Sequence, residues 1–154
     1  MAVCLQRAAE LERAIIDKMS AMEAATAFLE DLTEIESDVI AEFQNNTSGH
    51  AYELTGKTTS AGTSYLDLLR SSDVGILNNT QHYVRNDATY SNQDILYDDF
   101  IAKIESKMDE KNTFSQKTMI ELQSLTAKRD QSYDMISNVL KSLSTVLVGN
   151  VNNM

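Results

Sequence analysis

The chain has no proline and no tryptophan, one cysteine and five glycines among its 154 residues. Because proline interrupts helices, its absence permits very long helices. Cys4 has no second cysteine to pair with, which excludes a disulfide scaffold. One cysteine and two distant histidines, His50 and His82, also exclude structural zinc sites built from Cys and His.

Positive charge is scarce as well. The chain carries 13 Lys and Arg against 23 Asp and Glu, a net charge of −10. We therefore expect no nucleic-acid partner, because phosphate backbones require a basic surface. Anionic membranes are disfavoured for the same reason. Since no run of roughly 18 apolar residues is present, we expect no direct membrane span.

Apolar residues recur in alternating steps of four and three along the first 43 residues. Ten of the twelve positions are apolar, the exceptions being Lys18 and Glu36. This spacing is typical of a coiled-coil seam, and it predicts a helix over residues 3–44 that ends in the polar cluster 45–49. The seam positions are Cys4, Ala8, Leu11, Ile15, Lys18, Met22, Ala25, Leu29, Leu32, Glu36, Val39 and Phe43. Further apolar residues widen the stripe, which favours a bundle with more than one neighbour. They are Ile16, Met19, Phe28, Ile35 and Ile40.

The same spacing returns near the C-terminus and predicts a second helix over residues 91–148, followed by a tail over 149–154. Ser91 and Asp94 resemble a capping box at its start, and Gly149 stands where a helix C-cap is expected. Ten of the fifteen seam positions are apolar. They are Tyr97, Ile101, Ile104, Met108, Lys111, Ser115, Thr118, Leu122, Leu125, Arg129, Ser132, Ile136, Val139, Leu143 and Val146.

Two polar interruptions break this second seam, at residues 111–118 and at Arg129 with Ser132. They fit a kinked seam or a partner that supplies matching polar groups. We favour a third interpretation, a slight phase drift of a straight helix, because an ideal helix drifts by about 20° per heptad.

The segment between the two helices, residues 45–90, holds four of the five glycines and many Thr, Ser and Asn residues. It predicts a short helix over residues 65–69 and extended pieces at 74–77 and 83–84. The fold class that we expect is all-α. It is a single domain over residues 1–154, a long antiparallel coiled-coil hairpin of two heptad helices with a polar mixed insert between them.

Charge is unevenly distributed along the chain. Residues 1–43 carry a net charge of −7, whereas from Met135 onward the only charged side chain is Lys141. Because charge is depleted where protein surfaces meet, we expect the C-terminal end to make contacts with other proteins.

Residue patterns for catalysis are missing. The sequence Gly56-Lys57-Thr58 imitates the end of a P-loop, but Ala51 stands where the motif requires an earlier glycine. We interpret His50 and His82 as loop histidines in water, and Cys4 as a small apolar seam residue. The methionines of the two helices are interpreted as core fillers rather than adaptable binding residues. We predict no catalytic residue, no metal site, no cofactor and no enzyme activity.

Residues 115–143, and Leu122 to Lys141 in particular, resemble the closing helix of hydrophilic translocators of bacterial type III secretion. These are the needle-tip proteins of the IpaD/SipD/BipD group and the filament proteins of the EspA/SseB group. The order of Asp73-Val74-Gly75-Ile76, then Ser91-x-x-Asp94-Ile95-Leu96, then the helix is similar as well.

The resemblance implies a secreted structural protein of a virulence-associated secretion system, which forms a needle tip or an extracellular filament and supports effector translocation. It also implies export through the secretion channel without a cleaved signal peptide, and residues 1–7 indeed lack the pattern of one. The implied partners are a needle subunit or copies of the chain, together with a hydrophobic translocator and a cytoplasmic chaperone. The residues expected to form the assembly surface are Leu122, Gln123, Leu125, Lys128, Tyr133, Ile136, Asn138, Val139, Lys141 and Leu143.

Two other function classes stay open. Small size and an acidic balance are also typical of cytoplasmic secretion chaperones or adaptors. A helical ligand-binding bundle of a membrane receptor is the other alternative, and a small ligand such as a bile salt could lie between its helices.

Overall fold

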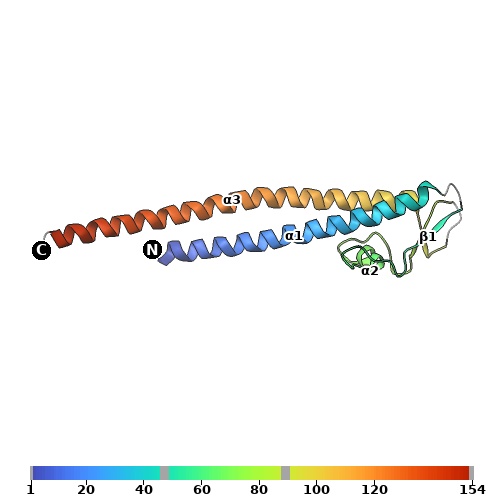
Figure 1. The fold of residues 1–154 in the computed structure, drawn as a ribbon, viewed down its shortest axis with the longest axis horizontal. Coiled ribbons are helices and arrows are strands. Elements are labelled where there is room, and N and C mark those ends of the chain that lie inside the picture. Colours follow the sequence, from blue (N-terminus) through green and yellow to red (C-terminus); the bar gives the residue numbers. More distant parts are fainter. Residues whose placement is uncertain (1, 46–48, 88–90, 153–154) are drawn as a thin grey trace. The chain divides into compact units, whose positions relative to one another are not determined.

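The computed structural model describes residues 2–45, 49–87 and 91–152. Its elements in chain order are α1 (Ala2–Gln44), β1 (Ala51–Glu53), α2 (Tyr65–Arg70), β2 (Tyr83–Arg85), β3 (Asp94–Leu96) and α3 (Tyr97–Asn152), as Figure 1 shows. The internal contacts separate into unit 1, residues 1–24 with 115–154, and unit 2, residues 25–114. Each long helix contributes to both units. The single domain expected from the sequence stays a prediction.

In unit 1 the first part of α1 packs antiparallel to the last part of α3. Lys18 forms an ion pair with Glu121. Nearer the N-terminus, Glu12 accepts a hydrogen bond of 2.7 Å from the hydroxyl of Tyr133. Residues nearer the N-terminus of α1 thus contact residues nearer the C-terminus of α3, as in an antiparallel pair.

In unit 2 the remaining parts of α1 and α3 also run antiparallel. The Phe43 ring lies 4.8 Å from the Tyr97 ring, and the Lys111 ammonium lies 4.8 Å from the Phe28 ring. Residues 45–90 supply seven of the fourteen residues of the hydrophobic core. These are Leu54, Tyr65, Leu69, Val74, Ile76, Leu77 and Val84. The segment expected to be a polar insert therefore supplies half of the core of unit 2.

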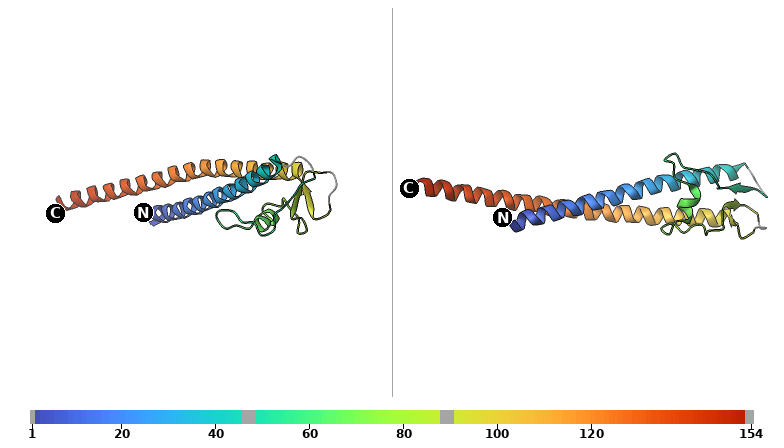
Figure 2. Two further views of the ribbon diagram at one scale, coloured as in Figure 1. Left: turned by 45° about the vertical axis from the view of Figure 1, so that its right-hand side comes forward. Right: turned by 90° about the horizontal axis from the view of Figure 1, so that it is seen from below.

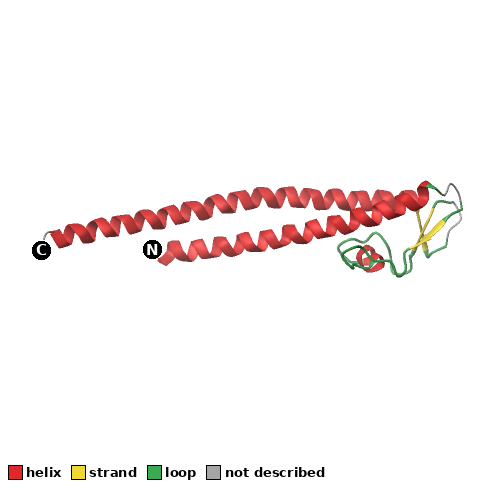
Figure 3. Cartoon of the chain, in the orientation of Figure 1, coloured by secondary structure: helices red, strands yellow, loops and turns green. Residues whose placement is uncertain are grey.

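Three short strands form a sheet in the order β1-β2-β3 (Figure 3), with β1 antiparallel and β3 parallel to β2. Buried Val84 at the centre pairs with Tyr52 on one side and Ile95 on the other. The structure is therefore mostly helical with a small sheet, and the all-α prediction is correct only approximately. The helix predicted at 65–69 and the extended piece at 83–84 are confirmed by α2 and β2.

The extended piece predicted at residues 74–77 is wrong. The backbone N–H groups of Val74 and Gly75 both donate to the Ser71 carbonyl, at 3.0 and 2.9 Å, and form a turn. Gly75 adopts a φ of 60°, a conformation that a residue with a side chain rarely takes. The turn directs Ile76 and Leu77 into the core, where both are buried.

The helix predicted from Ser91 begins at Tyr97 instead. Ser91 and Asp94 do interact, because the Ser91 N–H donates to the Asp94 carboxylate at 2.9 Å. That carboxylate is buried and also lies 2.9 Å from Nε of Arg85, on strand β2. This ion pair holds residues 94–96 beside β2, where they form a strand. The Ser91–Asp94 hydrogen bond therefore stabilises a turn rather than the start of a helix.

The predicted helix ends have mixed outcomes. The first helix, expected over residues 3–44, is confirmed by α1. Residues 46–48 of the polar cluster after it lie outside the described residues. The second helix does not end before Gly149 but continues to Asn152, since Gly149 stays helical without the left-handed conformation of a C-cap.

The polar residues that interrupt the second seam are still buried or half-buried at their seam positions. Thr118 and Ser132 are buried, with 2% and 5% of their surface exposed, and residues 111, 115 and 129 are half-buried. Our interpretation as phase drift is wrong, because a drifting helix would have turned these residues toward water. Ser132 satisfies its hydroxyl by donating to the Lys128 carbonyl at 3.0 Å.

Candidate assembly surface

In residues 2–45, 49–87 and 91–152, no group of three or more His, Cys, Asp and Glu side chains could hold a metal ion. Over the same ranges, no helix is both long and apolar enough to cross a membrane.

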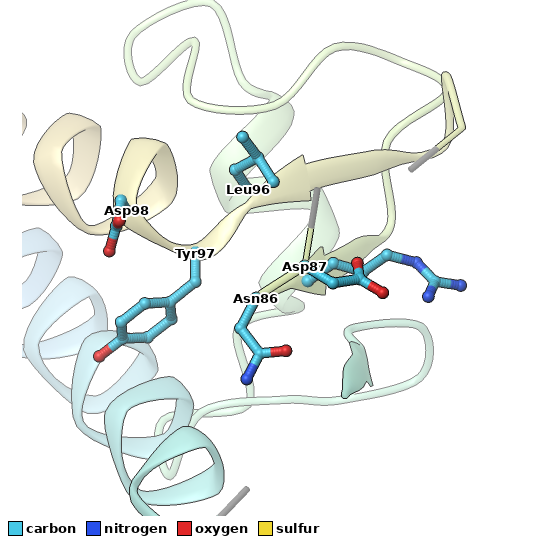
Figure 4. A pocket seen from close by; sticks show the side chains of 6 residues that line it. Asn86, Asp87, Leu96, Tyr97 and Asp98 are labelled. Carbon is cyan, nitrogen blue, oxygen red and sulfur yellow. The ribbon is translucent and has the colours of Figure 1, made fainter. Parts of the chain in front are cut away.

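A small hollow of about 260 Å³ in unit 2 is lined by residues 85–87 and 96–98 (Figure 4). In Figure 4 the side chains of Asn86 and Tyr97 extend to one side of the chain, and that of Leu96 extends to the other. Burial, followed by the charge of Asp98, raises the pKa of the Tyr97 hydroxyl. The phenol therefore stays protonated at neutral pH.

We expected both histidines to be loop residues in water, and this interpretation is wrong. His50 is half-buried, with Nε2 at 2.7 Å from a carboxylate oxygen of Glu42 and its ring edge-on to Phe43. His82 is half-buried against the ring of Tyr83. Both histidines have structural contacts within unit 2.

The ten residues expected to form the assembly surface lie on different faces of α3. Four of them are half-buried and offer a partner less surface than the others do. They are Leu122, Leu125, Ile136 and Val139. The other six are exposed. They are Gln123, Lys128, Tyr133, Asn138, Lys141 and Leu143.

The most exposed apolar surface is the last part of α3, residues 140–152, which we call the α3 end. Figures 1 and 2 show that α3 continues past the N-terminal end of α1. Apart from half-buried Gly149, every residue of the α3 end is exposed. The large apolar side chains among them are 51–68% exposed. They are Leu140, Leu143, Val146, Leu147, Val148 and Val151.

Four of these six side chains share one face of the helix. With about 3.6 residues per turn, Leu140, Leu143, Leu147 and Val151 fall on one stripe. The opposite face carries neutral hydroxyl groups, and one of them, on Thr145, donates to the Lys141 carbonyl at 3.0 Å. Covering one such leucine is worth about 1.5–3 kcal/mol. The α3 end therefore has the composition of a docking surface.

A second apolar feature, which we did not predict from the sequence, is a groove of about 520 Å³ beside the seam of unit 1. We call it the side groove. Its lining residues are Ile15, Met19, Met119, Leu122, Gln123, Thr126, Ala127 and Asp130. Met19 and Met119 are 50% and 46% exposed, so our interpretation of them as core fillers is wrong. The same correction applies to Met135, which is 56% exposed.

A sequence signal for this groove exists, in a second heptad stripe on α3. One position after the seam, residues 119, 126, 133, 140 and 147 recur every seven residues, and four of the five are apolar or aromatic. Met119, Tyr133 and Leu147 are 46%, 42% and 62% exposed. The stripe thus leads from the side groove to the α3 end on one side of the helix.

The net charge differs between the two units. Unit 1 contains seven acidic and seven basic residues and is neutral, whereas unit 2 contains sixteen acidic and six basic residues and carries the net charge of −10. The exposed apolar surface on the α3 end and in the side groove thus belongs to the neutral unit.

Comparisons with known proteins give no relative for this chain: no family model, no curated protein and no solved structure matches it.

Proposed function

We propose that this chain is a structural protein that assembles with other protein chains through unit 1 and catalyses no reaction. One observation carries the proposal, the exposed and nearly uncharged apolar face of the α3 end. In a chain of net charge −10, two copies approach with least repulsion through a neutral unit. In this proposal α1 and α3 form one antiparallel coiled-coil hairpin, and acidic unit 2 keeps the assembly in solution.

The resemblance of residues 115–143 to hydrophilic translocators leads us to propose a place for this assembly. The protein is exported by a type III secretion system and forms a needle tip or an extracellular filament. Its partners are copies of itself or a needle subunit, and a cytoplasmic chaperone holds it before export. A nearly uncharged docking helix and a separate acidic unit support this proposal, because a shared contact and a displayed surface are what such a subunit needs.

The assembly surface is tested by placing charges on the α3 end. We expect the double variant Leu143→Asp and Leu147→Asp to stay monomeric in sedimentation velocity, because roughly 3–6 kcal/mol of leucine burial is lost. The control variant Ser142→Asp and Thr145→Asp adds the same charge to the opposite face and should assemble like the unaltered chain. Equal behaviour of both variants would overturn the docking role of this face.

The place of action is tested by fractionating cultures of a strain that carries a type III secretion system. We expect the protein in the culture supernatant of the competent strain and only in the cells of a secretion-null strain. Retention in the cytoplasm of both strains would reject secretion and favour a chaperone or adaptor.

A further inference from the structure

The two units differ in what covers the pair of long helices. In unit 2 the segment between the helices covers a side of the pair, with Leu54, Tyr65 and Leu69 fully or almost fully buried against it. In unit 1 the side groove stays open over exposed Met19 and Met119. Since a helix pair with a wide apolar stripe needs a further layer, the side groove fits a third helix.

The α3 end matches the groove in length. The groove extends along α3 from Met119 to Asp130, which is about 17 Å at 1.5 Å per residue. Residues 140–152 form a helix of about 18 Å. The apolar stripe of the α3 end is therefore long enough to cover the whole groove.

The charges match as well. Asp130 is the one charged residue that lines the groove, and its carboxyl is 62% exposed beside Arg129. Lys141 is the one charged residue of the α3 end. If the α3 end lies antiparallel to the α3 that forms the groove, Lys141 comes beside Asp130, and Leu147 comes near Gln123. Lys141 can reach the carboxylate while its methylene chain covers apolar surface.

We infer that the α3 end of one copy lies in the side groove of a second copy, antiparallel to the α3 of that copy. The inference rests on the proposed function and specifies its contact. The two surfaces are different, so each copy keeps one groove and one α3 end for further neighbours. Such a head-to-tail contact produces a ring when it closes and a filament when it does not.

Disulfide trapping in the full chain tests this contact. In a Cys4→Ser background, one protein carries Leu147→Cys and another carries Gln123→Cys, and the two are mixed and oxidised. A disulfide forms when the two Cα atoms come within about 4.4–6.8 Å. We expect the mixed disulfide to form at least tenfold faster than with Thr145→Cys, the matched control on the opposite face of the α3 end.

The outcomes separate this inference from the proposed function. Preferred trapping between two Leu147→Cys chains, or equal trapping of Thr145→Cys, would overturn the inference. Sedimentation of both proteins as assemblies without the mixed disulfide would also overturn it and would leave the proposed function standing. Monomers at every concentration would reject both.

A second pair of variants tests the groove without cysteines. We expect Met119→Glu to abolish assembly, and Ile120→Glu, its neighbour outside the groove, to leave assembly unchanged. Circular dichroism checks that both variants keep their helices. Assembly of both variants alike would contradict the contact.

Discussion

At the scale of single residues, Glu36 is the most informative polar residue of the first seam. It is half-buried on α1, and burial, the charge of Glu105 and a hydrogen bond to Glu105 raise the pKa of its carboxyl group. The folded state therefore holds this proton more tightly than the unfolded state does. The contribution of this carboxyl group to folding stability is fully present when the pH is below its pKa in the unfolded state. It is lost as the pH rises through its pKa in the folded state.

We predict that Glu36→Gln raises the free energy of unfolding at pH 7 by about 0.5 kcal/mol, because it removes one of two facing carboxylates. The gain should vanish as the pH falls toward the usual range of a carboxyl group, where the native carboxyl is protonated. Urea unfolding of both proteins across this range measures the effect. Glu53→Gln is the control, since it removes the same charge from an exposed position of unit 2. An equal gain in both variants would assign the effect to net charge instead.

At the scale of elements, the heptad pattern predicted the α1 seam because it is a local signal: all twelve of its positions are buried or half-buried. The sheet could not be predicted in the same way. Its strands are three residues long, and Val84 finds its partners Tyr52 and Ile95 at distant places in the sequence. The Ser91–Asp94 motif was misinterpreted because it forms the same hydrogen bond in a turn before a strand as in a capping box.

The residues proposed for the assembly surface illustrate the same limit of local sequence patterns. We proposed its location on the C-terminal helix from the seam and from the low charge of that helix. Which seam residues α1 covers depends on the pairing register of the two helices, and this register is not a local property of the sequence. For this reason Ile136 and Val139 were grouped with Leu143, although only Leu143 is exposed.

The seam of unit 1 makes a testable prediction at this scale. Within the described residues, the buried hydroxyl oxygen of Ser115 has no hydrogen-bond partner. Ser115→Ala should therefore stabilise the α1–α3 pair by roughly 1–2 kcal/mol, through the removed hydroxyl and the better helix propensity. The control Ser124→Ala, at an exposed position, gains the propensity alone. Thermal unfolding compares the two, and an equal shift would contradict the unpaired hydroxyl.

At the scale of the whole molecule, the main feature is the separation of a neutral unit from an acidic one. The acidic charge of unit 2 makes copies repel each other, whereas the apolar contact that we propose for unit 1 should be nearly insensitive to salt. We therefore predict that raising the salt concentration from about 0.05 to 0.5 M strengthens assembly, because the Debye length becomes shorter. Light scattering over a salt titration measures this. Assembly that weakens as salt rises would mean that charge pairs dominate the contact instead.

The most direct test of the account removes the α3 end. A chain that ends at Val139 keeps the seam contacts of unit 1 that involve Lys18 and Glu12. Sedimentation velocity over a range of concentrations compares this chain with the full one. The account predicts that the full chain forms assemblies and that the shortened chain, with its helices intact, sediments as a monomer. Identical sedimentation of the two chains would contradict the claim that the α3 end is the assembly surface.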